Sequence, residues 1–178
     1  MENSTHPTFG TFCWRVISLH MVTYFIFGIL SATLFHYKDL FATETMSLLM
    51  KPVTSPWVAA GPMLQVIRGL IFALVLWPIR AVILTERYGW FYLWLLFLGL
   101  AILGTAGPSI GSTEGIIYTI IPVKQQLIGL PEVILQTLLF SVLLFYWYKK
   151  PLKAWNIINA VLVVLIILMS LAGALYSR

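Results

Sequence analysis

Arg68 stands inside a long apolar stretch of the sequence, where a guanidinium can bind carboxylates and other anions. Only 11 residues, all uncharged, separate it from Arg80, so the two lie about 18 Å apart on a helix. If Arg80 reaches the headgroups on the inner side of a bilayer, Arg68 remains in the outer half of the hydrocarbon core. An arginine at the bilayer centre costs ~2.5–3.5 kcal/mol on insertion scales, so we expect Arg68 to face a bundle interior and to find a partner.

Two carboxylates and two amides are placed where they could serve as partners. Gln65 precedes Arg68 by three residues and Gln136 follows Glu132 by four, so each amide shares a helix face with its charged neighbour. Glu132 begins an apolar run, and Glu114 precedes an isoleucine-rich segment at the same side of the membrane. The predicted ligand-binding cluster therefore consists of Gln65, Arg68, Glu114, Glu132 and Gln136, with Tyr118 as a further donor. No residue is assigned a catalytic role.

This cluster has three interpretations. In the main hypothesis Arg68 receives a small polar or anionic solute from the outer side, and the chain is a small transport or binding protein. In the second, the chain is a membrane-embedded enzyme that acts on a lipid or isoprenoid, with Glu114 or Glu132 as acid or base. In the third, the cluster is a structural clasp between residues 60–84 and 131–148 of a non-catalytic accessory or structural subunit of a membrane complex.

The sequence predicts neither a metal site nor a cofactor. His20 and His36 are 16 residues apart, about 24 Å along a helix, so they cannot bind one metal ion. We expect His20 to be a packed or hydrogen-bonded polar residue. Cys13 is the single cysteine, which excludes an internal disulfide framework.

The composition indicates which elements must position these side chains. Of the 178 residues, 60% are hydrophobic and only 10% are charged, a balance that is typical of membrane proteins. A helix needs ~20 apolar residues to cross a bilayer core. Continuous apolar runs without two-residue alternation predict an all-α, polytopic helical bundle with five transmembrane helices in a single domain, 1–178. The five predicted helices cover about 14–35, 60–84, 90–106, 131–148 and 154–176.

The connection between the third and fourth predicted helices is unusual. Residues 107–130 contain several Gly and Pro residues, which argue against a continuous helix. Residues 115–123 are nevertheless uncharged and rich in isoleucine, but too few to cross a bilayer. We expect an interfacial or re-entrant segment here; an ordinary surface loop that packs on the helix ends is the alternative.

The distribution of Lys and Arg predicts the orientation and the environment. With the N-terminus inside, the inner side carries Arg15, Arg80, Arg87, Lys149, Lys150 and Lys153, and the outer side carries Lys38, Lys51, Lys124 and Arg178. This excess predicts a multi-pass protein of the cytoplasmic (inner) membrane, with the N-terminus inside and the C-terminus outside. The expected partners are the lipid bilayer and either further copies of the chain or another membrane subunit. Nucleic acid is not an expected partner, because the basic residues flank membrane helices.

Overall fold

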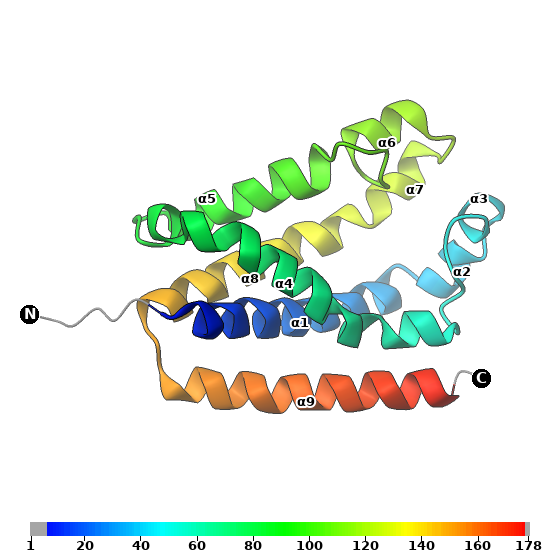
Figure 1. Ribbon diagram of the computed structural model, residues 1–178. Coiled ribbons are helices and arrows are strands. Elements are labelled where there is room, and N and C mark those ends of the chain that lie inside the picture. Colours follow the sequence, from blue (N-terminus) through cyan, green and yellow to red (C-terminus); the bar gives the residue numbers. More distant parts are fainter. Residues whose placement is uncertain (1–6, 177–178) are drawn as a thin grey trace, which may run out of the picture.

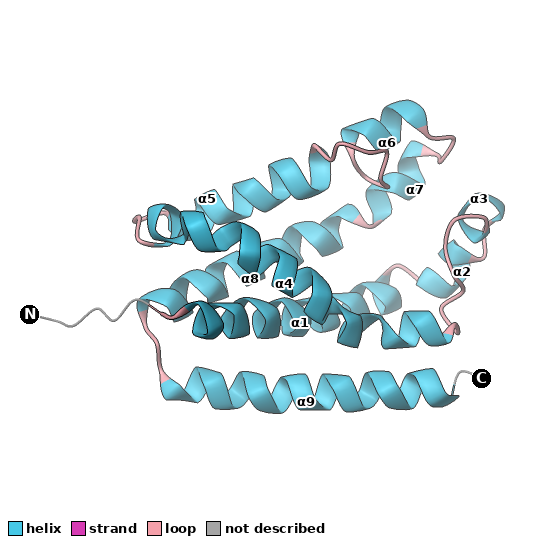
Figure 2. Cartoon of the chain, viewed as in Figure 1, coloured by secondary structure: helices cyan, strands magenta, loops and turns pink. Residues whose placement is uncertain are grey.

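The computed structural model describes residues 7–176, and over this range the chain is all-helical (Figures 1 and 2). The elements are α1 (Phe9–Leu34), α2 (Tyr37–Phe41), α3 (Glu44–Ser47), α4 (Pro56–Leu84), α5 (Gly89–Leu96), the π-helical segment η1 (Phe97–Leu103), α6 (Thr113–Tyr118), α7 (Val123–Ile128), α8 (Leu130–Lys149) and α9 (Lys153–Tyr176). The predicted all-α class is confirmed for the described residues.

Four stretches are long and apolar enough to cross a membrane. They are α1, α4, the continuous stretch Val123–Lys149 that joins α7 and α8, and α9. The predicted third transmembrane helix, 90–106, corresponds to α5 and η1, which end at Leu103 and form a shorter apolar helix. Its last turn widens into a π-helix that closes with a hydrogen bond from Gly104 N to Gly99 O, 2.8 Å. The count of five transmembrane helices therefore stays a prediction.

Local sequence signals explain where the long helices begin. α1 starts at Phe9, before the predicted residue 14, because the Thr8 hydroxyl caps the helix by accepting from Thr11 N. α4 starts with Pro56, whose fixed φ and missing N–H suit the first helical position. Pro62 and Pro78 lie inside the same helix, and such interior prolines are tolerated in transmembrane helices.

The helices run between two structurally different ends. α1, α5–η1 and α9 run in one direction and α4 and α8 in the other (Figure 1). At the left of Figure 1 the connections 85–88 and 150–152 are short, and we call this the turn end. At the right lie the short helices α2, α3, α6 and α7, within residues 35–55 and 104–129, and we call this the cap end. α1 is central, since it packs against α4, α8 and α9.

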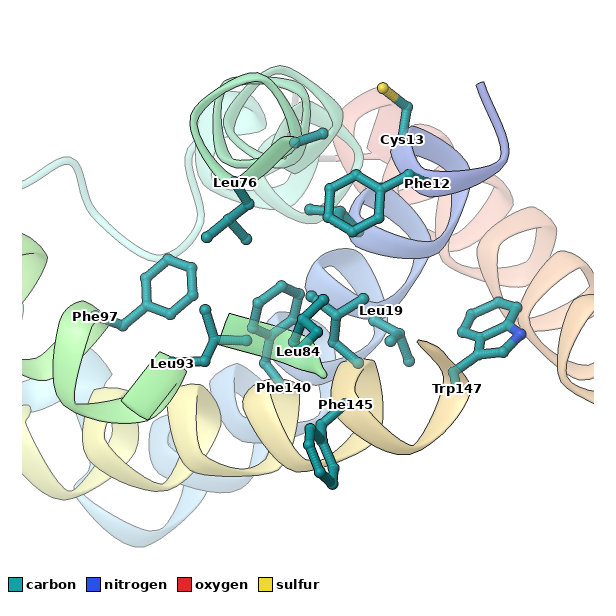
Figure 3. Close-up of a cluster of buried hydrophobic side chains, with 13 residues drawn as sticks. Phe12, Cys13, Leu19, Leu76, Leu84, Leu93, Phe97, Phe140, Phe145 and Trp147 are labelled. Atoms are coloured by element: carbon teal, nitrogen blue, oxygen red, sulfur yellow. The ribbon is translucent and has the colours of Figure 1, made fainter. Parts of the chain in front are cut away.

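The largest hydrophobic core lies in the half of the bundle next to the turn end (Figure 3). It consists of residues from the first half of α1 and the last half of α8, which pack directly on each other, together with residues of α4, α5 and η1. Its buried members include Phe12, Val16, Leu19, Leu76, Leu93, Phe140, Leu144 and Trp147. Because lipid tails are as apolar as these side chains, close van der Waals packing rather than escape from water stabilises this core.

α1 and α4 cross very closely at a glycine. A Cβ atom at Gly69 would lie 2.9 Å from the Cα of Ile17, nearer than real Cβ contacts allow. Gly69 thus permits the backbones to approach, as small residues do at the interfaces of membrane helices. The crossing fixes which residues of α1 and α4 face each other above and below it.

Candidate functional site

The candidate site lies where α1, α4 and α8 face one another near the middle of the bundle. Arg68 is close to the centre of α4, and its guanidinium carbon lies 5.3 Å from the centroid of the Phe72 ring. Within the described residues the guanidinium makes no hydrogen bond and no ion pair. The Arg68 side chain is exposed, so the expectation that it faces the bundle interior is wrong, and the partnership that we expected with Glu132 or Glu114 is not formed.

His20 of α1 holds one of the predicted amides beside Arg68. The imidazole is buried, and its Nε2 donates to Oε1 of Gln65 at 3.1 Å. The same amide orientation allows Gln65 Nε2 to donate to Gly61 O at 3.5 Å. The edge of the His20 ring also packs on Phe72 with 4.9 Å between the ring centroids. The expectation that His20 is a packed, hydrogen-bonded residue is thus confirmed.

A small cavity of about 30 Å³ separates Arg68 from Gln136 of α8. Its walls come from α1, α4, η1 and α8, namely His20, Arg68, Phe72, Phe97, Ala101, Ile102, Val133, Gln136, Thr137 and Phe140. Gln136 is only 6% exposed, yet its amide has no hydrogen-bond partner among the described residues. The Thr137 hydroxyl, in contrast, is occupied by donating to Val133 O at 2.7 Å. The free donors at this cavity are therefore the guanidinium and the Gln136 amide.

We call His20, Gln65, Arg68 and Gln136 the midspan cluster. Three of its members, Gln65, Arg68 and Gln136, belong to the predicted ligand-binding set, and His20 connects them. A cavity of this size holds one or two water-sized groups, because a water needs ~10–15 Å³ of such volume. The arrangement can hold a small group that accepts hydrogen bonds and carries negative charge.

Glu132 lies nearer the cap end, in a different environment. Its carboxylate accepts hydrogen bonds from the Tyr37 hydroxyl of α2 and from the Ser31 side chain of α1. Burial, followed by this hydrogen bond to Glu132, raises the pKa of Tyr37, so its hydroxyl stays protonated and remains the donor. Tyr24 of α1 interacts electrostatically with both Glu132 and Arg68. Glu132 and Arg68 form no ion pair with each other.

The structure does not bring Glu114 and Tyr118 to the midspan cluster. Both belong to α6, which packs against α7 at the cap end, and Tyr118 is 71% exposed. Gln126 of α7 holds this region together by donating to Gly115 O and Ile121 O at 3.2 and 2.9 Å. α6 and α7 thus form a compact pair that is held together by hydrogen bonds. The prediction that this pair enters a bilayer as a re-entrant segment stays a prediction.

Three residues that interact with the predicted ligand-binding residues were not included in that set by the sequence analysis: His20, Tyr24 and Tyr37. His20 could have been included, because an ionisable residue within an apolar helix is a functional candidate by default. Tyr24 and Tyr37 could not have been identified from the sequence, since aromatic residues are common in membrane proteins near the interface. Within the described residues, no group of three or more His, Cys, Asp or Glu side chains is arranged to hold a metal ion.

Comparison of the chain with protein-family models, with curated protein sequences and with solved structures finds no match. The functional argument therefore rests on the geometry of the site.

Proposed function

We propose that the protein binds a small inorganic anion of halide size at the midspan cluster and carries it across the membrane. The observation that supports this most directly is the free guanidinium of Arg68 beside a cavity of about 30 Å³. The buried Gln136 amide, which also lacks a partner among the described residues, adds a second donor at the same cavity.

The energetics favour an anion over a neutral solute. Removing a cation from water costs several kcal/mol unless a counter-charge and hydrogen bonds replace the lost hydration. Arg68 obtains neither from the described residues, whereas an anion in the cavity supplies both. The small volume excludes larger solutes, so a single ion with at most one water fits the space.

The small cavity shares one wall residue, Val133, with a larger cavity nearer the cap end. Towards the turn end the path is closed by the packed core around Leu19 and Leu144. Release of an anion on the turn-end side therefore requires this core to open.

Chloride is the probe that tests the proposal. The protein is reconstituted in lipid nanodiscs, and binding is followed as broadening of the ³⁵Cl NMR line. We expect broadening with the wild type and at least a tenfold loss of it with Arg68→Ala, because, among the described residues, Arg68 is the only one with a full positive charge that lines the small cavity. Arg87→Ala is the matched control: Arg87 lies at the turn end, stacked 5.3 Å from the Tyr88 ring, and its loss should leave broadening unchanged.

Transport is measured separately as chloride efflux from proteoliposomes. Efflux that disappears in Arg68→Ala but persists in Arg87→Ala supports the whole proposal. Line broadening without efflux overturns the transport half and leaves an anion-binding protein. A wild type that causes no broadening, or an Arg68→Ala variant that broadens the line as strongly, overturns the anion site itself.

A further inference from the structure

A second and much larger cavity lies at the cap end of the bundle. Its volume is about 770 Å³, within the ~300–1,000 Å³ that is typical of small-molecule sites. α1, α4 and α8 form its walls, and residues of α2, α3 and α7 close it at the cap end. We call it the cap-end cavity.

The lining of the cap-end cavity is mainly apolar and notably aromatic. Aromatic side chains come from three helices, namely Tyr24 and Phe25 of α1, Tyr37 and Phe41 of α2, and Trp57 of α4. The Tyr37 and Phe41 rings stack with 5.2 Å between their centroids. Aromatic faces carry partial negative charge, and they attract cations most strongly where water is excluded.

One acidic group lies in the wall of this mainly apolar cavity. Glu132 is the one carboxylate among the described lining residues. The Tyr37 and Ser31 hydroxyls hydrogen-bond to it, but both are neutral donors, and no Lys, Arg or His of the described part of the chain forms an ion pair with it. A partly buried carboxylate with hydrogen bonds but no counter-charge stabilises a cation that is placed beside it.

The basic residue of the lining does not supply that counter-charge. Lys51 belongs to the segment between α3 and α4, and its side chain is exposed. Because this side chain is exposed, its ammonium group keeps its hydration. Glu132, in contrast, is only partly exposed and lies beside Gly28, where a built Cβ would be 4.0 Å from the carboxylate. The interior of the cap-end cavity is acidic and aromatic.

We propose that the cap-end cavity binds a monovalent organic cation with an aromatic or alkyl body, whose positive group lies against Glu132. The body fills the apolar space and contacts the aromatic rings, and the carboxylate selects the sign of the charge. An anion of the same shape meets an uncompensated carboxylate, and a neutral molecule gains no charge pairing. This site is distinct from the anion site at Arg68, and the evidence for it does not depend on that proposal.

Tetraphenylphosphonium is a suitable probe, because tetraphenylborate has the same shape and the opposite charge. Binding of each is measured by equilibrium dialysis against nanodiscs of zwitterionic phosphatidylcholine, with empty nanodiscs subtracted to remove partition into lipid. We expect saturable binding of the cation and none of the anion. We further expect Glu132→Gln to weaken cation binding about tenfold or more, because it removes the charge and keeps the shape of the side chain.

Two controls keep the result interpretable. Glu44→Gln makes the same chemical change on an exposed residue of α3 that does not line the cavity, and it should leave binding unchanged. Thermal unfolding of each variant verifies that the fold is retained. The comparison of the two probes on the wild type tests the sign of charge without any substitution, so a misfolded Glu132→Gln does not decide the result.

Three outcomes overturn the inference: equal saturable binding of tetraphenylborate, unchanged cation binding in Glu132→Gln, or no cation binding above that of empty nanodiscs. None of them bears on chloride binding at Arg68, which has its own readout. Failure of the two proposals is therefore distinguishable.

Discussion

The same three helices, α1, α4 and α8, build two halves of the bundle with opposite character. Next to the turn end their side chains interlock, and Phe12, Leu144 and Trp147 are fully buried. Next to the cap end they separate around a cavity of about 770 Å³. Larger apolar side chains in that space would gain van der Waals contacts. Moving them there from lipid would cost little, because lipid and the protein core are equally apolar. The hollow half is where we propose that a ligand binds.

Two arginines, one in each half, differ in the same way. Arg15, in the packed half, donates from Nη1 to Trp147 O at 3.2 Å and lies 5.6 Å from the Trp147 ring centroid. Arg68 has no such hydrogen bond among the described residues and lines a cavity. The first arginine joins α1 to α8, and the second is available to a ligand. The comparison teaches that burial with a protein partner, not charge alone, separates a structural arginine from a functional candidate.

Truncating a phenylalanine in each half should produce the largest difference. Phe140 is buried in the packed core, so Phe140→Ala should lower the free energy of unfolding by ~3–5 kcal/mol. Phe41 already borders the cap-end cavity, so Phe41→Ala should cost about 1 kcal/mol or less. Unfolding in mixed micelles, followed by tryptophan fluorescence, measures both. Equal losses would show that the cap-end half is packed as tightly as the other.

The two arginines provide the next largest effect. Arg15→Ala should destabilise the protein by about 2–3 kcal/mol, because it removes a charged hydrogen bond and leaves Trp147 O without that donor. Arg68→Ala should leave the free energy of unfolding unchanged or raise it, because the variant removes a charge that no described residue compensates. The same micelle assay checks both variants. Strong destabilisation by Arg68→Ala would favour the structural clasp over the binding site.

Substitution of two glycines on α4 should change the free energy of unfolding least, and in opposite directions. Gly69→Ala should destabilise by ~1–3 kcal/mol, because its Cβ would meet the backbone of Ile17 at 2.9 Å. Gly61 lines the cap-end cavity and has no atom within 4 Å of a built Cβ, so Gly61→Ala should stabilise α4 by ~0.5–1 kcal/mol. Melting temperatures of the two variants should move in opposite directions. A shift in the same direction would contradict the difference in packing along this helix.

Sequence reasoning located most of the candidate site but not its contacts. It selected Gln65, Arg68 and Gln136, because polar residues inside apolar runs are conspicuous one at a time. It paired Arg68 with carboxylates, because opposite charges attract when nothing else is known. In the structure Tyr37 and Ser31 hydrogen-bond to Glu132 instead, and these partners lie about a hundred residues away along the chain. Hydrophobic periodicity contains no information about such pairings.

What the sequence determined by itself is the helical class and the presence of long apolar helices. These follow from length and hydropathy alone, since a backbone in lipid must satisfy its own hydrogen bonds and a helix does so locally. Tertiary structure decided that His20 reaches Gln65, that Glu132 faces a large cavity and that Glu114 does not approach Arg68. These facts depend on how each helix is rotated and where it crosses its neighbour. Close packing sets both, as at Gly69 and Ile17, and packing is a property of pairs of helices rather than of any single one.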